Sequence, residues 1–114
     1  MPSFISVSTA AYDGYDFDVI LPSLARCGIR NVEFAFIDGY VEVFTDSDFT
    51  AAFAAELKSE MQRHGQQCRY FSGHIDLGIE NAAARLEARC RFAASLGASF
   101  VITNAATRER AGTF

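Results

Sequence analysis

Four short apolar runs recur along the chain, and segments with helical periodicity lie between them. The runs cover residues 4–8, 31–36, 67–74 and 99–104. The first run alternates apolar and polar residues, as a half-exposed strand does. The second is nearly continuous in apolar residues, which is typical of parallel strands that are covered on both faces. The pattern therefore predicts four strands.

Three helices are predicted between these strands, because apolar residues recur there at spacings of three or four. Glycines that can stop a helix follow each segment, at Gly28, Gly65 and Gly97. The predicted helix faces are Ile20, Leu24 and Cys27, then Phe49, Phe53, Leu57 and Met61, and finally Leu86, Cys90, Ala93 and Gly97.

Two local features bear on where the helices begin. The run from Thr45 to Asp48 offers several N-caps for the second helix, and Asp16 or Asp18 could cap the first. Pro22 is acceptable only near the first turn of its helix, where few backbone donors are needed.

The strand-helix unit repeats every 30–40 residues or so, which is the size of a βαβ building block. We therefore predict an α/β fold of order β-α-β-α-β-α-β, with a parallel sheet and right-handed crossovers, in a single domain over residues 1–114.

Charge and composition exclude some partners. The net charge is −4 and the ten basic residues are scattered, whereas a nucleic-acid footprint or an anionic-membrane surface needs them clustered. The chain has no run of 18 apolar residues and no basic stretch before an apolar N-terminal one, so neither a transmembrane helix nor a signal peptide is expected. Cys27, Cys68 and Cys90 lack CxxC spacing, and we expect buried free thiols in a reducing cytoplasm.

The loop after the first strand, Thr9-Ala10-Ala11-Tyr12, has no GxGxxG motif, which disfavours dinucleotide-binding and P-loop folds. A phospho-receiver domain would need acidic residues where Ser8, Thr9 and His74 stand. The remaining common parallel fold is the (β/α)₈ barrel, which typically needs ~250 residues. The chain would then supply the first half of a TIM barrel.

Three segments carry a specific resemblance: GIRNVEF, HGQQCRYFSGHIDL and RFAASLGASFVITN. They resemble the opening half of xylose isomerase-like TIM barrels, in particular the sugar phosphate isomerase/epimerase family. The resemblance implies a divalent-metal enzyme (Mn, Mg, Co or Zn) that isomerises or epimerises a sugar, sugar phosphate or polyol. The family's usual metal ligands come from later strands, so this chain would contribute His74 at most, and the isolated chain would be inactive.

The stretch Gly73-His74-Ile75-Asp76-Leu77 places a histidine and an acid at the end of the third strand, where parallel folds gather ligand groups. His74 could be a metal ligand, a substrate-binding donor or a proton shuttle, or simply a strand-end histidine bonded to the backbone. Asp76 could orient His74 as a hydrogen-bond acceptor, or it could cap a turn.

Glu33 interrupts an apolar strand, and a buried carboxylate must be paired or protonated. It could contact a sugar hydroxyl or a metal's surroundings and act in catalysis with His74, or bond a strand serine such as Ser6, Ser8 or Ser72. Asn104 ends the fourth strand, where its amide could bind a substrate hydroxyl or begin a loop. The fold placement also suggests Tyr12 and Phe36 as substrate-pocket residues, whereas Phe49 and Phe53 should face the sheet as core.

Two alternatives stay open. Barrels of the endonuclease IV group carry metal-binding histidines after strands three and four; His74 matches the first, but Asn104 stands at the second, and the acidic charge also counts against a nuclease. Alternatively, the chain is a non-catalytic binding or assembly module. Because a half-barrel has open sheet edges, we expect a homo-oligomer or a complementing C-terminal half as partner.

Overall fold

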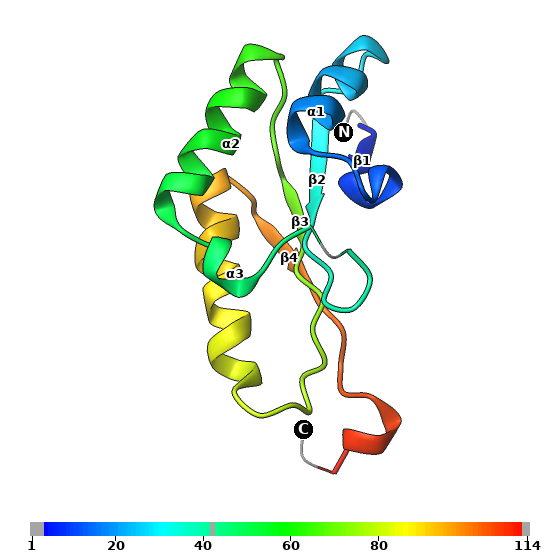
Figure 1. Cartoon of the computed structure of the whole chain (residues 1–114), viewed down its shortest axis with the longest axis vertical. Coiled ribbons are helices and arrows are strands. Elements are labelled where there is room, and N and C mark those ends of the chain that lie inside the picture. Colours follow the sequence, from blue (N-terminus) through cyan, green and yellow to red (C-terminus); the bar gives the residue numbers. More distant parts are fainter. Residues whose placement is uncertain (1–3, 42, 113–114) are drawn as a thin grey trace.

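The computed structural model describes residues 4–41 and 43–112, and it shows strands and α-helices in alternation (Figure 1). The sheet has the order β1-β2-β3-β4, with every neighbouring pair parallel. The predicted parallel α/β order is therefore confirmed. The strands are β1 (Ser6–Ser8), β2 (Asn31–Ala35), β3 (Tyr70–Ser72) and β4 (Phe100–Ile102), and the helices are α1 (Phe17–Arg26), α2 (Ala51–Arg63) and α3 (Ala82–Leu96).

Three short 3-10 helices complete the described chain: η1 (Thr9–Tyr12), η2 (Asp46–Asp48) and η3 (Arg108–Arg110). η3 lies in the polar tail 105–114. The N-terminal residues 1–3, on which the signal-peptide prediction partly rests, and residues 113–114 of that tail lie outside the described residues.

The third strand is shorter than predicted because a bulge interrupts it. Asn31 of β2 bridges to Gln67, but Phe34 pairs with Phe71, so three steps on β2 match four steps on the neighbouring strand. One extra residue in a strand is a β-bulge. It allows both Cys68 and Phe71 to point into the core, although they are three residues apart.

One face of the sheet is covered by the helices, and the core lies between the two layers. In Figure 1, α2 and α3 run beside the strands on one side. Phe36 is at the centre of this layer: its ring lies 5.1–5.7 Å from those of Phe44, Phe49, Phe71 and Phe92. Clustered aromatic rings bury large apolar areas and prefer these edge-to-face and offset geometries.

Asp16 is the N-cap residue of α1, as predicted, although its side chain makes no capping hydrogen bond. The start of α2 differs from the prediction. α2 begins after Thr50, whose hydroxyl accepts the Phe53 N–H, whereas Thr45 and Asp48 form a reciprocal capping box on η2. Phe49 therefore precedes the helix and still packs against the core. Pro22 lies in the second turn of α1, further into the helix than expected.

The buried face of α3 is also different from the prediction. Leu86 is only half-buried and Cys90 is exposed. A buried arginine, Arg89, occupies the inward position instead. The buried residues of α3 are Ala82, Arg89, Phe92, Ala93 and Leu96.

Within the described chain, no helix covers the other face of the sheet. Tyr70 of β3 stacks between Phe4 and Phe100 there, with ring centroids 6.0 and 5.3 Å away. Phe4 is 41% exposed and Phe100 is 60% exposed. The side of the sheet that carries this uncovered aromatic row would point into a closed barrel, and we call it the inner face.

The three cysteines are all free thiols, as predicted, but only Cys68 is buried. The expectation that Cys27 and Cys90 are buried was wrong, because both lie on the exposed side of their helices. Burial raises the pKa of the Cys68 thiol to about 11, so this thiol stays protonated and unreactive at neutral pH.

Candidate functional site

The segments that follow β2, β3 and β4 stay side by side beyond the strands, and we call their meeting place the strand-end edge. The Asp38 N–H donates to the His74 carbonyl at 2.9 Å, and the Gly73 N–H donates to the Ile102 carbonyl at 2.9 Å. Ligand groups of parallel α/β folds gather at this end of the strands.

His74 and Asn104 meet at the strand-end edge. Nδ1 of His74 lies 2.9 Å from Oδ1 of Asn104. An amide oxygen only accepts hydrogen bonds, so Nδ1 is the donor, and the neutral form of the ring has its lone pair on Nε2. The ring is half-buried and the amide is exposed. The structure therefore brings two of the predicted site residues together and leaves Nε2 as an acceptor.

Asp76 is not the hydrogen-bond acceptor of the His74 ring. One of its oxygens accepts the Gly78 N–H at 2.8 Å and the Thr107 N–H at 3.1 Å, and the other accepts Nη1 of Arg110 at 2.6 Å. The hydrogen bond from Gly78, with those from Arg110 and Thr107, lowers the pKa of Asp76 to about 2. Of the two predicted roles, the turn-capping one is observed.

Glu33 shares the inner face but lies away from His74. It pairs with Ser8 on one side, and the register of Phe34 with Phe71 places it beside Tyr70 on the other. That position is four residues before His74, or roughly 13 Å along the strand. Glu33 is half-buried rather than buried, so solvent can stabilise its charge without a partner. The predicted bond to a strand serine is not observed among the described residues.

Tyr12 and Phe36 belong to the helix layer rather than to the strand-end edge. Phe36 continues the alternation of Val32 and Phe34 into the core and is 0% exposed. The Tyr12 hydroxyl lies 2.8 Å from Oγ of Ser23 in α1, and its ring packs against the core. The interpretation of both as substrate-pocket residues is corrected, because their rings are already in contact with protein.

A network of two arginines and two aspartates, which the sequence did not reveal, braces the β2–α2 loop. Nε of Arg85 donates to Asp46 at 2.7 Å, and Nη2 of the same residue donates to Asp38 at 3.2 Å. Nη2 of Arg89 donates to Asp46 at 3.0 Å. The Asp38 backbone also bonds His74, so the network adjoins the strand-end edge.

The pKa values in the network favour its charged form. The hydrogen bond from Arg85 lowers the pKa of Asp46 to about 2, helped by Arg89 and opposed by partial burial. Asp46 in turn raises the pKa of Arg85. The guanidinium of Arg89 also lies 5.0 Å from the centre of the Phe49 ring, so a cation–π contact adds to the ion pair.

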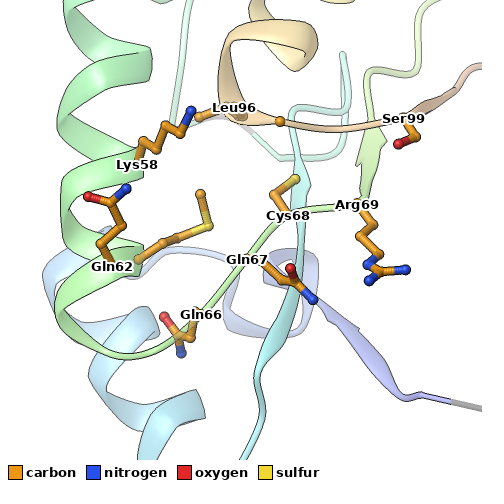
Figure 2. Close-up of a pocket in the computed structure, with 10 residues that line it drawn as sticks. Lys58, Gln62, Gln66, Gln67, Cys68, Arg69, Leu96 and Ser99 are labelled. Carbon is orange, nitrogen blue, oxygen red and sulfur yellow. The ribbon is translucent and has the colours of Figure 1, made fainter.

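A pocket of about 340 Å³ lies at the opposite end of the sheet, where α2 and α3 end and β3 begins (Figure 2). Lys58 reaches toward Leu96 across it, and the buried Cys68 forms part of its wall. Arg69 turns away toward the inner face, with its guanidinium 4.9 Å from the Phe4 ring. The pocket is therefore separate from the strand-end edge.

Two properties of the described residues bear on function. Nowhere in residues 4–41 and 43–112 do three or more His, Cys, Asp or Glu side chains converge as metal ligands. Over the same ranges, no helix combines the length and apolar character needed to cross a membrane. Any metal near His74 would therefore need ligands from elsewhere.

The parallel sheet, the single helix layer and the strand-end edge together define a part of a (β/α) barrel. No protein-family model and no curated protein matches the sequence. Among solved structures, the fold is similar to that of a xylose isomerase domain protein from Alicyclobacillus acidocaldarius subsp. acidocaldarius. The TM-score is 0.61 with 19% sequence identity over 86% of this chain and 35% of that chain. The likeness confirms the predicted xylose isomerase-like barrel fold. This chain spans about a third of the length of the matched protein.

Proposed function

We propose that this chain is part of a sugar isomerase or epimerase and that its strand-end edge binds a sugar, sugar phosphate or related polyol. The observation that supports this most is the His74–Asn104 pair, which joins the ends of β3 and β4. The fold likeness to a xylose isomerase domain protein adds support for the substrate class.

The pair suits a hydroxyl-rich ligand. Nε2 of His74 can accept a hydrogen bond or a proton from a substrate hydroxyl, because Nδ1 is the nitrogen bound to Asn104. The amide nitrogen of Asn104 can donate to a neighbouring oxygen of the same ligand. Glu33, one or two side-chain layers deeper on the inner face, would reach only a ligand that extends into the barrel.

A divalent metal (Mn, Mg, Co or Zn) fits this proposal with His74 as one ligand. Metal-bound histidines commonly donate their second ring N–H to a carbonyl or carboxylate oxygen, which is the arrangement of His74 and Asn104. When bound, such a metal would polarise the carbonyl and hydroxyl oxygens of the sugar. Its remaining ligands would lie outside the described residues.

The test is an isomerisation assay on the intact protein that contains this chain. Aldoses, ketoses and their phosphates would be incubated with each of the four metals in deuterated water, and deuterium entry beside the carbonyl carbon would be followed by NMR. Metal-dependent exchange that His74→Ala reduces supports the proposal. Absence of exchange with every sugar and metal, from a folded protein, would rule out this reaction class.

A second candidate is a non-catalytic half-barrel that assembles with a partner, and the exposed inner face favours it. Phe100 and Ile102, 60% and 41% exposed, would be covered by another half-barrel. We propose either a second copy or a complementing C-terminal half as that partner. Native mass spectrometry of the protein from its own cells measures whether this half-barrel is a separate subunit of an assembly or part of one longer enzyme chain.

A reducing, cytoplasmic location remains part of the proposal, since all three cysteines are free.

A further inference from the structure

Asp76 joins the two segments that carry the candidate site. His74 lies two residues before it on the segment after β3, and Thr107 lies three residues after Asn104 on the segment after β4. The carboxylate of Asp76 accepts N–H groups from both segments, at 2.8 Å from Gly78 and 3.1 Å from Thr107. Side-chain acceptors that bridge two loops in this way restrict both of them.

The contact between the two segments is close as well as polar. Nη1 of Arg110 donates to Asp76 at 2.6 Å. A Cβ atom on Gly78 would lie 2.5 Å from Cβ of Arg110 and 2.8 Å from the Arg110 carbonyl oxygen. Only glycine allows the tail backbone to approach so closely. The Leu77 N–H adds a long hydrogen bond of 3.4 Å to the Ala105 carbonyl.

We propose that Asp76 is a positioning residue, which sets the His74–Asn104 hydrogen bond by holding the segment after β4 against the segment after β3. Asn104 is exposed, so little packing fixes its side chain apart from the position of its backbone. If the tail moves away, the amide oxygen leaves Nδ1 and the imidazole can exchange between its tautomers. The role in turnover rests on the proposed function, but the role in the tautomer does not.

The tautomer can be measured directly. The chain contains two histidines, His64 and His74, so ¹⁵N-histidine labelling of the intact protein gives two ring systems in one NMR spectrum. His64 caps the far end of α2 and serves as an internal reference. In the wild-type protein, the two ring nitrogens of His74 should show well-separated shifts, with Nδ1 protonated.

Three variants grade the loss of the contact. Asp76→Ala removes every acceptor and should bring the two His74 nitrogen shifts together, as tautomers mix. Asp76→Asn keeps one oxygen for Gly78 and Thr107, and should restore most of the separation. Gly78→Ala keeps the Asp76 carboxylate but forces the Arg110 backbone away, and it should act like Asp76→Ala. Glu80→Ala, which removes the same charge from an exposed residue of the same loop, is the matched control and should change nothing.

The proposal is overturned if a folded Asp76→Ala protein keeps the wild-type His74 shifts, or if Glu80→Ala alters them equally. If Asp76→Ala does not fold, the same criterion is applied to the His74 shifts of Gly78→Ala. Where the intact protein turns over a sugar, Asp76→Ala should lower kcat by about 10–100-fold with a smaller effect on KM. A tautomer that responds as expected in a protein without sugar turnover would leave the positioning role standing and refute the proposed function.

Discussion

Nδ1 of His74 lies 2.9 Å from Oδ1 of Asn104, although 30 residues separate them in the chain. They meet because β3 and β4 are parallel neighbours, with Ser72 paired to Ile102. Two further steps along each strand then bring His74 and Asn104 opposite one another. The hydrogen bond makes Nδ1 the donor, so the neutral form of the ring has its lone pair on Nε2, which faces away from Asn104.

The first prediction concerns this pair in the intact protein. His74→Ala should lower turnover by roughly one to three orders of magnitude, because it removes the acceptor nitrogen. Asn104→Leu should cost about 10–100-fold, since it removes the oxygen that orients the ring and the amide donor proposed to contact the ligand. Asn104→Asp keeps an oxygen acceptor and is the matched control. Equal kinetics for wild type and His74→Ala would show that the histidine is structural.

Pattern and topology together were enough to predict that His74 and Asn104 lie at the same edge of the sheet. Both follow strands, and parallel strands end at one edge. Phe36 was misplaced although the same logic applied: the alternation of Val32 and Phe34 sends Phe36 into the helix layer. Phe36 was instead predicted to line the substrate pocket because it lies near the end of β2.

Arg89 could not be predicted from the sequence. Helical periodicity is recognised from the spacing of apolar residues, and an inward-facing arginine interrupts that spacing. This shifted the predicted face of α3 toward Leu86 and Cys90. The partner that makes the burial tolerable, Asp46, is 43 residues away in a loop, and nothing local in the sequence links the two. The turn-capping role of Asp76 was predicted, but its contact with Arg110 was not, because Arg110 is 34 residues distant.

The second prediction is a pH dependence of stability that arises from Asp46. Its pKa is about 2 in the folded chain, below the ordinary value of 3.8. A lowered folded-state pKa contributes stability that is complete above the unfolded value, near pH 4, and is lost as the pH falls through 2. The unfolding free energy should therefore decrease between pH 4 and pH 2, and this decrease should be smaller in Asp46→Asn. Chemical denaturation at several pH values measures it; identical slopes in the two proteins would contradict it.

The third prediction separates the charge of Arg89 from its bulk. Arg89→Ala should lower the unfolding free energy by about 2–5 kcal/mol, mainly because it opens a cavity beneath the Phe49 ring; Asp46, which is 41% exposed, keeps Arg85 as a partner. Arg89→Met fills most of the space without a buried charge and should cost much less. Denaturant titration of both variants gives the comparison. If methionine is as damaging as alanine, the ion pair with Asp46 matters more than the packing.

The fourth prediction uses the cysteines. Cys27 and Cys90 are exposed, whereas Cys68 is buried with a pKa of about 11. A thiol reagent at pH 8 should therefore label two cysteines quickly and the third only on unfolding. Mass spectrometry of tryptic peptides identifies the protected site. Rapid labelling of Cys68 in the native protein would mean that the core between α2 and α3 opens readily.

The last prediction concerns these 114 residues expressed alone. β1 and β4 are the outer strands of the described sheet, and open strand edges invite pairing with another chain. The inner face adds exposed apolar side chains, Phe100 and Ile102 among them. The chain should therefore dimerise or aggregate as its concentration rises, and sedimentation velocity would show this. It should also lack sugar isomerase activity, since nowhere in the described residues do three or more potential metal ligands converge.

Replacing Phe100 by Ser tests whether the inner face drives this association. The variant should shift sedimentation toward the monomer, because the residue is 60% exposed on the uncovered face. Tyr40→Ser is the matched control: Tyr40 is 61% exposed but lies in the β2–α2 loop. If both variants associate equally, the strand edges rather than the inner face are responsible. A wild-type chain that stays monomeric at high concentration and turns over sugar with added metal would place a complete active site within this half-barrel, which is contrary to the geometry described above.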